Sequence, residues 1–212
     1  MRKLAYGIVI LLVLAGAVFL WLRMNPADRI PPAPPVAAAP QPAVPPPAAQ
    51  EVLAENVLLL QLKNGTVEIE MLPGLAPSHV ARIKELARQN FYDGLKFHRV
   101  IEGFMAQTGD PRGNGTGGSG KNLAAEFNTG MHVRGAVSMA RAASPNSADS
   151  QFFIVLADSQ FLDRNYTMWG RVIRGMEFVD QIKKGDANRN GEVVEPDIIV
   201  SMKVKADVVA AR

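Results

Sequence analysis

Residues 57–71, with the sequence VLLLQLKNGTVEIEM, carry the pattern that most constrains the fold of this chain. Apolar residues occupy alternate positions on both sides of Asn64-Gly65: Leu58, Leu60 and Leu62 before it, and Val67, Ile69 and Met71 after it. Alternation places apolar side chains on one face of a strand, and Asn-Gly is preferred in two-residue hairpin turns with positive φ. The segment therefore predicts an antiparallel β-hairpin with a primed turn and one buried face.

Short strand candidates continue along the chain and are separated by glycine-rich turns: LKFHRVI, FMAQT, GAVSMA, QFFIVLA, MWGRVI and IIVSMKVKAD. Apolar residues at helical spacing predict one helix from Pro77 to about Asn90 and another within residues 175–184. Strands and helices do not alternate regularly, as they would in a parallel sheet. About eight strands with irregular loops favour a mainly β fold, a closed eight-stranded antiparallel β-barrel capped by two α-helices, because closure leaves no exposed sheet edge.

The first part of the chain differs in composition from the rest, since ten of the 15 prolines lie between Pro26 and Pro47. This stretch lacks aromatic residues, and its prolines favour an extended polyproline backbone, so it is predicted to be a spacer. Three parts follow from this change in composition: a membrane anchor or signal sequence (residues 1–23), a Pro/Ala-rich linker (residues 24–52) and a folded domain (residues 53–212).

Residues 4–22 form an uncharged apolar run of 19 residues. At about 1.5 Å per residue, a transmembrane helix of this length nearly spans a hydrocarbon core of ~30 Å. Because Arg2 and Lys3 precede the run, the positive-inside rule places the N-terminus in the cytoplasm. We expect a single-pass protein of the inner (cytoplasmic) membrane with its folded domain on the periplasmic side. A cleaved signal peptide and a soluble periplasmic protein form the alternative.

Charge and cysteine content argue against several kinds of function. After residue 29 the chain has 19 basic and 19 acidic residues and no dense stripe of lysine and arginine, so no nucleic-acid-binding face is predicted. The chain contains no cysteine, which removes disulfides, thiolate nucleophiles and cysteine-ligated metals. We expect neither a metal nor an organic cofactor.

Two loops resemble ligand-binding motifs. GTGGSGKN (residues 115–122) is close to a phosphate-binding P-loop, but Asn122 stands where the motif needs a serine or threonine for magnesium. DANRNGEVVEPD (residues 186–197) has the early spacing of a calcium-binding EF-hand loop, but it ends in Asp197 instead of glutamate and precedes a predicted strand. We therefore interpret both segments as turns rich in small and polar residues.

The three histidines do not form a recognisable hydrolase motif. His79 lies in the first turn of a predicted helix, His98 is next to Arg99, and His132 is in a loop. No Gly-x-Ser-x-Gly nucleophile segment accompanies them. We interpret each histidine as a surface or structural residue.

Residues 97–110, FHRVIEGFMAQTGD, place Arg99 among apolar residues, and the nearest acidic residue in sequence is Glu102. A guanidinium does not lose its proton in a protein, so it is a poor general base or nucleophile. In SQFFI (residues 150–154), alternation places Gln151 and Phe153 on one face. The pattern indicates an apolar patch that carries a fixed group of N–H donors and two amides.

Four segments closely resemble the cyclophilin-type peptidyl-prolyl cis-trans isomerases, particularly bacterial members: FHRVIEGFMAQTGD, GAVSMARA, PNSADSQFFIVL and FLDRNYTMWGRVIRGMEFVDQI. The resemblance extends over roughly residues 57–207. It implies the closed barrel with two helices and an enzyme (EC 5.2.1.8) that speeds rotation about Xaa-Pro bonds in folding proteins. Together with the predicted N-terminal segment, we expect this activity outside the cytoplasm. It implies proline-containing polypeptides as partners, and we expect a monomer. A binding module or holdase that uses the same groove without catalysis is the alternative function.

The resemblance also implies a mechanism without covalent or acid/base chemistry. Conjugation of the nitrogen lone pair opposes rotation about an Xaa-Pro bond, with a barrier of about 18–20 kcal/mol. A donor aimed at this nitrogen favours the twisted geometry, in which the lone pair is localised. By the resemblance, Arg99 is this donor, and Gln107 orients either the substrate carbonyl or Arg99.

The substrate-binding residues follow from the same match. The resemblance implies that the backbone of Ala140 and Arg141 pairs with an extended peptide and that Gln151 fixes the patch. Phe161 and Tyr166 occupy positions where many eukaryotic members carry tryptophan and histidine, so cyclosporin affinity is not implied. The predicted lining of the proline pocket is Phe104, Met105, Phe153 and Leu162.

Overall fold

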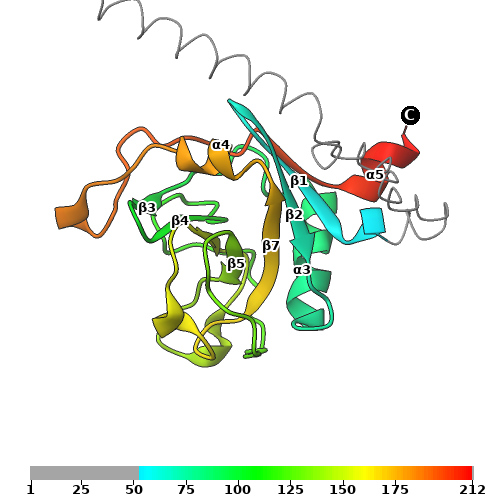
Figure 1. Cartoon of the computed structure of the whole chain (residues 1–212), viewed down its shortest axis with the longest axis horizontal. Helices are drawn as coiled ribbons and strands as arrows, with labels where there is room; N and C mark the ends of the chain where they lie inside the picture. Colours follow the sequence, from blue (N-terminus) through cyan, green and yellow to red (C-terminus); the bar gives the residue numbers. More distant parts are fainter. Residues whose placement is uncertain (1–52, 212) are drawn as a thin grey trace, which may run out of the picture. The chain divides into compact units, whose positions relative to one another are not determined.

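The computed structural model describes residues 53–211. Eight antiparallel strands form one sheet in the order β3-β4-β6-β5-β7-β2-β1-β8. Strands β7, β2 and β1 lie side by side in Figure 1. The strands are β1 (Val57–Leu62), β2 (Gly65–Met71), β3 (Arg99–Ile101), β4 (Met105–Thr108), β5 (Ala136–Met139), β6 (Phe152–Val155), β7 (Met168–Arg174) and β8 (Ser201–Val204). They are accompanied by the α-helices α3 (Pro77–Arg88), α4 (Met176–Asp180) and α5 (Lys205–Ala210) and by the 3-10 helices η2 (Pro145–Ser147), η3 (Gln160–Leu162) and η4 (Ala187–Arg189). The predicted mainly β class is confirmed.

The predicted hairpin is present as β1 and β2, and all its alternating apolar residues are buried. The predicted turn type is wrong. Leu62 pairs with Gly65, so the turn residues are Lys63 and Asn64, and neither has a positive φ. Gly65 serves packing instead, because a Cβ at this position would overlap the ring of Phe178 in α4.

The first predicted helix is confirmed as α3, which stops two residues before Asn90. Asn90 has a left-handed φ of 57°, a conformation that ends helices. The second predicted helix is shorter than expected, since α4 ends at Asp180. Its continuation is prevented because the Lys183 N–H donates to the Asp197 carboxylate (2.8 Å) instead of to a helical carbonyl.

Helix α5 was not predicted, because the sequence favoured a last strand that continued to Asp207. Strand β8 ends at Val204. The following residues form a helical turn whose side chains bind elsewhere: Lys205 pairs with Glu68 (3.0 Å) and Asp207 with Arg88 (3.0 Å). These contacts to other elements, together with the packing of Ala206 against the buried core, leave no signal in the local sequence.

The predicted barrel closure is confirmed only in part, because the curled sheet has β3 and β8 as edge strands that do not pair with each other. The segments before these strands do meet, through an isolated bridge between Lys96 and Ile198. The outer edge of β3 is occupied by a loop, since the Val100 N–H donates to the Gly191 carbonyl (2.8 Å). A loop therefore covers the strand that bears Arg99.

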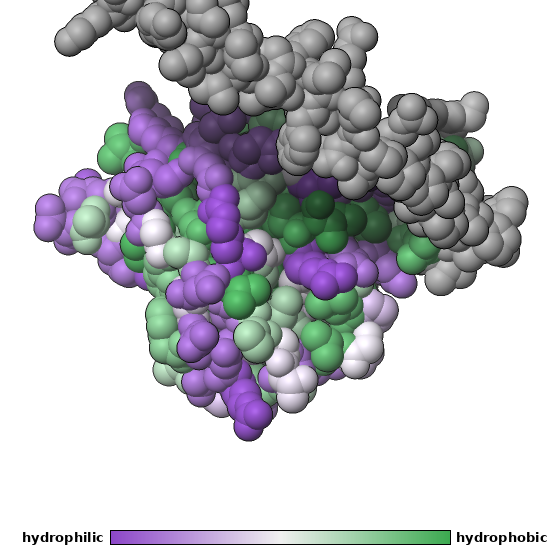
Figure 2. All heavy atoms as spheres, viewed as in Figure 1, coloured by the Kyte–Doolittle hydropathy of each residue, from purple (hydrophilic) through white to green (hydrophobic). Residues whose placement is uncertain are grey.

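The buried residues form two clusters. The larger one fills the interior and is built around Trp169, whose ring meets Phe152 edge-on at 5.6 Å. The smaller one contains Met105, Ala136, Phe153, Val155, Leu162 and Met168. On the face drawn in Figure 2, hydrophobic and hydrophilic residues are intermixed, as on most folded surfaces.

The predicted anchor (residues 1–23) and linker (residues 24–52) lie outside the residues that the structure describes. Within residues 53–211, no helix has both the length and the apolar character needed to cross a bilayer.

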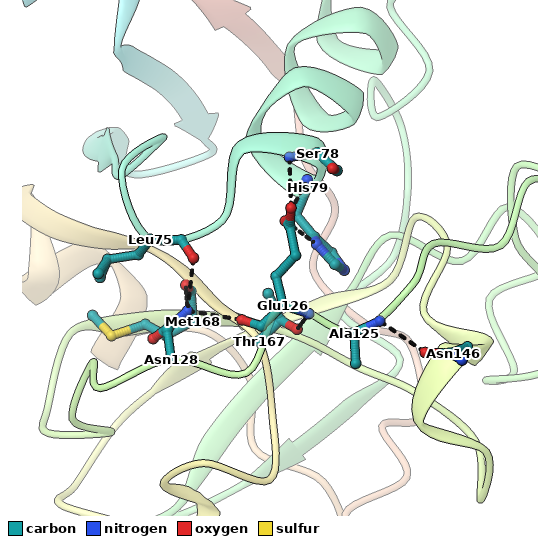
Figure 3. Close-up of polar contacts among 9 residues, drawn as sticks. All are labelled: Leu75, Ser78, His79, Ala125, Glu126, Asn128, Asn146, Thr167 and Met168. Carbon is teal, nitrogen blue, oxygen red and sulfur yellow. Dashed lines mark hydrogen bonds and ion pairs between the residues drawn. The ribbon is translucent and has the colours of Figure 1, made fainter.

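A carboxylate from a distant loop caps the first turn of α3. Glu126 accepts hydrogen bonds from the backbone N–H groups of Ser78 (3.0 Å) and His79 (3.1 Å) and from Nδ1 of His79 (2.6 Å), as Figure 3 shows. The same loop is also anchored to Thr167, because the Glu126 N–H donates to Thr167 Oγ1 (3.0 Å). Burial alone would raise the pKa of Glu126, but these hydrogen bonds hold the pKa below its ordinary value.

We expect Glu126→Ala to lower the free energy of unfolding at pH 7 by about 1–2 kcal/mol, the usual cost of losing a helix cap. A carboxylate with a lowered folded-state pKa stabilises the fold above its unfolded pKa of about 4.3, and this stabilisation is lost as pH falls through the folded pKa. The difference between wild type and variant should therefore shrink in acid. Urea unfolding at pH 7 and near pH 3 measures it.

The matched control is Glu102→Ala, since Glu102 is exposed and forms no ion pair within residues 53–211. Its unfolding free energy should match that of wild type at both pH values. An equal loss in the two variants would contradict the capping role of Glu126.

Candidate active site

Strand pairing brings the predicted catalytic residues together. Arg99 on β3 lies opposite Gln107 on β4, and Gln107 lies opposite Phe153 on β6. Arg99 Nη1 donates to Gln107 Oε1 (3.2 Å), and Gln107 Nε2 donates to Gln151 Oε1 (2.9 Å). Gln151 in turn donates to the Gly117 carbonyl (2.7 Å). Because Gln151 uses its Nε2 to donate to a carbonyl, its Oε1 is left to accept from Gln107. Gln107 therefore donates from Nε2 and turns its Oε1 toward Arg99.

The guanidinium of Arg99 is held by neutral acceptors only. Its Nε donates to the Asn190 carbonyl (3.0 Å), and its Nη2 donates to Asn190 Oδ1 (2.9 Å). Within residues 53–211 it forms no ion pair. Together with the bond to Gln107, three of the five guanidinium N–H groups are engaged, which leaves one on each terminal nitrogen. Burial lowers the pKa of Arg99, but its ordinary value is so high that the group remains charged.

A pocket of about 90 Å³ with both polar and apolar lining residues lies beside this guanidinium. Met105, Phe153 and Leu162 are almost completely buried at its base. The full lining is Arg99, Phe104, Met105, Gln107, Ala140, Arg141, Phe153, Leu162 and Tyr166. Nine of the eleven predicted site residues therefore surround one small cavity.

The remaining two predicted residues lie next to this pocket. Gln151 lines an adjoining cavity of about 290 Å³, which shares Gln107, Ala140 and Arg141 with the small pocket. Phe161 is 69% exposed at the rim, with its ring 5.4 Å from that of Phe104. Phe161 is therefore a surface residue of the site and not part of its base.

Tyr166 is fixed by contacts on two sides. The Arg141 guanidinium carbon lies 4.7 Å from the centre of the Tyr166 ring, which is within the range of cation–π attraction. Phe153 meets the same ring edge-on at 5.8 Å. Arg141 also donates to the Asn165 carbonyl from Nη2 (3.1 Å), so its side chain is directed toward Tyr166 and not into open solvent.

The backbone expected to pair with an extended peptide is partly engaged within the domain. The Ala140 N–H donates to the Gln151 carbonyl (2.9 Å). No backbone hydrogen bond within residues 53–211 uses the Ala140 carbonyl or the Arg141 N–H. One acceptor and one donor therefore remain for a peptide at this edge.

Comparison with known proteins identifies the family. The model of the family described as "Cyclophilin type peptidyl-prolyl cis-trans isomerase/CLD" matches residues 57–204, which is more than half of the chain. The chain belongs to the cyclophilin family. It is therefore a cyclophilin-type peptidyl-prolyl cis-trans isomerase.

Several relatives support this assignment. A probable peptidyl-prolyl cis-trans isomerase of Brucella suis is 51% identical over 165 residues, covering 72% of this chain and 84% of the Brucella protein. Peptidyl-prolyl cis-trans isomerase B of Bacillus subtilis is 43% identical over 129 residues, covering 60% of this chain and 90% of that protein. Among solved structures, a cyclophilin from Hirschia baltica is 30% identical with a TM-score of 0.63, covering 71% of this chain and 74% of its own.

A further solved relative carries information about ligands. The cyclophilin-type isomerase of Cryptosporidium parvum, solved in the presence of the dipeptide Ala-Pro, is 27% identical with a TM-score of 0.64. The alignment covers 70% of this chain and 98% of the Cryptosporidium protein. The curled eight-stranded sheet is thus shared with a relative crystallised together with a proline-containing peptide.

The histidines of this cyclophilin are buried, so the surface interpretation is wrong for all three and the structural one holds. His132 has a defined place behind the pocket: Nδ1 contacts Asp163 Oδ1 (2.8 Å), Nε2 contacts Ser138 Oγ (2.9 Å), and the ring stacks on Phe153. A serine, a histidine and an aspartate in this order resemble a hydrolase triad. Ser138 is completely buried, so its hydroxyl has no access to a substrate.

Sequence reasoning missed the residues that support this cyclophilin site from behind and beside it. Asn190 was interpreted as part of a turn, although its side chain binds Arg99. The two motif-like loops are explained structurally: residues 115–118 line the larger cavity, and residues 187–189 form η4. The sequence signal for Asn190 is the Asn190-Gly191 pair, which favours left-handed backbone conformations. Such pairs are common in turns, so the signal does not distinguish a site residue.

Proposed function

We propose that this cyclophilin accelerates Xaa-Pro rotation by donating a hydrogen bond from Arg99 to the prolyl nitrogen. The observation that carries this proposal is a charged guanidinium at the wall of a 90 Å³ pocket, with two N–H groups that no residue within 53–211 engages. The prolyl nitrogen accepts a hydrogen bond well only when its lone pair leaves conjugation. The donor therefore stabilises the twisted transition state more than the planar ground state, which is the requirement for a faster rotation.

The surroundings of Arg99 favour this chemistry. Partial burial weakens screening by water, so a fixed N–H donor interacts more strongly with the developing lone pair. Gln107 and Asn190 hold the guanidinium in advance, which removes the cost of orienting it during the reaction. Their amide and carbonyl oxygens are neutral, so the positive charge of the donor is not cancelled. Gln107 is the residue that aligns Arg99 with the pocket.

The pocket has an apolar base that fits a proline ring. Met105, Phe153 and Leu162 provide an apolar base for the ring, and Phe104 and Tyr166 flank it. The unused Ala140 carbonyl and Arg141 N–H would bind the peptide backbone, a mode that tolerates many sequences. The proposed partners are therefore proline-containing segments of unfolded or folding polypeptides, with few demands on the neighbouring side chains.

A structure of the domain with an Ala-Pro peptide tests the proposal directly. We expect the proline ring to lie on Met105 and Phe153, with an Arg99 terminal nitrogen within hydrogen-bonding distance of the prolyl nitrogen. An Arg99 side chain directed away from the bound proline would refute it.

The proposed place of action is outside the cytoplasm. Residues 4–22 would anchor a monomeric enzyme in the cytoplasmic membrane, and the Pro/Ala-rich linker would hold the catalytic domain away from the bilayer. Sequencing the N-terminus of the mature protein and fractionating membranes tests this proposal. A mature protein that begins after residue 23 and is soluble would support the alternative of a cleaved signal peptide.

A further inference from the structure

The loop that covers the outer edge of β3 is fastened on both sides of Arg99. The Val193 N–H donates to the His98 carbonyl (3.1 Å), directly before Arg99. On the other side, Val100 both donates to Gly191 (2.8 Å) and accepts from Gly185 (2.9 Å). The segment between Gly185 and Val193 is therefore aligned with the catalytic strand and cannot slide along it without breaking these bonds.

The conformation of this loop explains its calcium-loop spacing without a metal. Asp186 caps η4 by accepting from the Asn188 N–H (2.8 Å), and the Asp186 carbonyl accepts from the Gly191 N–H (2.8 Å). Asn190 and Gly191 both have left-handed φ angles, 54° and 78°. Gly191 passes so close to β3 that a Cβ would overlap the Ile101 side chain. Asp186, Asn190 and Gly191 therefore form a tight turn that directs the Asn190 side chain toward Arg99.

Asn190 offers two acceptors to one side of the Arg99 guanidinium. Its backbone carbonyl binds Nε (3.0 Å) and its side-chain oxygen binds Nη2 (2.9 Å). Gln107 binds the opposite terminal nitrogen, Nη1 (3.2 Å). Because the guanidinium is planar, contacts at three of its N–H groups define both its plane and its rotation.

We propose that Asn190 is a positioning residue for catalysis, which holds Arg99 in the orientation that faces the proline pocket without neutralising its charge. This inference rests on the proposed role of Arg99. Arginine has several rotatable bonds, and β3 is a three-residue edge strand, so the side-chain contact of Asn190 to Nη2 adds a third fixed point to those made by Gln107 and by the Asn190 carbonyl. A neutral amide fixes the group, whereas a carboxylate at the same place would pair with it and weaken the field at the prolyl nitrogen.

The test is the Asn190→Gly substitution in the full chain. Glycine adopts the left-handed conformation and keeps the backbone acceptor, so only the side-chain contact to Nη2 is removed. We expect kcat for a prolyl peptide to fall roughly tenfold, from the loss of one hydrogen bond to a charged group. KM should be nearly unchanged, because Asn190 does not line the pocket. The matched control is Asn188→Gly, whose side chain makes no hydrogen bond within residues 53–211 and whose kcat should stay at the wild-type value.

A double-mutant cycle with Arg99→Ala shows whether Asn190 acts through Arg99. Exchange spectroscopy of a proline-containing peptide measures the slow cis-trans rates of the weak variants. We expect Asn190→Gly to have no further effect when Arg99 is absent, since the only partner of the Asn190 side chain within residues 53–211 is gone. Guanidinium ¹⁵N NMR gives an independent readout, because rotation of the Arg99 Nη2 group should be faster in Asn190→Gly than in wild type.

The possible outcomes separate the two proposals. A wild-type kcat for Asn190→Gly, or an equal loss with and without Arg99, would overturn the positioning role while leaving the role of Arg99 intact. A wild-type kcat for Arg99→Ala would overturn the proposed mechanism itself.

Discussion

Arg99→Ala should lower kcat for a proline-containing peptide by roughly 100- to 1000-fold, the usual effect of removing one preorganised donor to a developing charge. The variant loses the N–H groups that face the pocket but keeps the apolar base on which the proline ring rests. KM should therefore change little, since the lost interaction exists mainly in the transition state. A peptide isomerisation assay at several substrate concentrations separates kcat from KM.

Two further substitutions make this result interpretable. Arg99→Lys keeps the positive charge but replaces the planar fork by a single point donor, so it should also lose most of the activity. Arg174→Ala removes an arginine that is exposed at the end of β7, and its activity should equal that of wild type. Full isomerase activity in Arg99→Ala would contradict the proposed role of Arg99. Loss of isomerase activity with unchanged protection of clients from aggregation would show that the groove binds clients without needing catalysis.

Phe153→Ala should lower kcat/KM by about 30-fold, mainly through a higher KM. Phe153 forms the base of the proline pocket and supports Tyr166 through an edge-on contact at 5.8 Å. Loss of roughly 2 kcal/mol of apolar contact with the proline ring corresponds to this factor. The substitution also leaves a cavity in the smaller buried cluster, so the assay belongs at a temperature where circular dichroism shows the variant to be folded.

The comparison with Phe161 gives this prediction its control. Phe161 is 69% exposed at the rim, and its ring contacts Phe104 instead of the base. Phe161→Ala should lower kcat/KM only a few fold, because an exposed side chain loses little contact area when it is truncated. Equal losses in the two variants would contradict the division of the pocket into a base and a rim.

Local pattern predicted those parts of the fold that depend on neighbours in sequence. The alternation in residues 57–71 predicted the β1–β2 hairpin, since strand pairing across a two-residue turn is a local event. The predicted turn type was wrong because Gly65 makes room for the ring of Phe178, a residue far along the chain, and does not occupy the turn itself. Helix α5 was missed for the same reason, since Arg88 and Glu68 stabilise it from other elements.

The candidate site likewise has residues that the sequence predicted and residues that only distant contacts reveal. The residues facing the pocket were predicted because they lie in segments that resemble a known family, and strand pairing then places Arg99, Gln107 and Phe153 opposite one another. Asn190 is 91 residues from Arg99 in sequence, and an asparagine before a glycine is typical of any turn. The place of His132 behind the pocket was not predicted, because a buried histidine with an aspartate partner 31 residues away leaves no periodic signal.

The neutral support of Arg99 has a consequence for the conditions under which the enzyme works. The side chains that hold and face the donor (Gln107, Gln151, Asn190, Met105 and Phe153) neither gain nor lose a proton between about pH 5 and pH 9. The contacts that orient Arg99 therefore have no pH optimum of their own in this range. A decline measured toward either extreme would therefore report a change outside these five side chains, and an enzyme whose donor is held in this way can serve surroundings whose acidity it does not control.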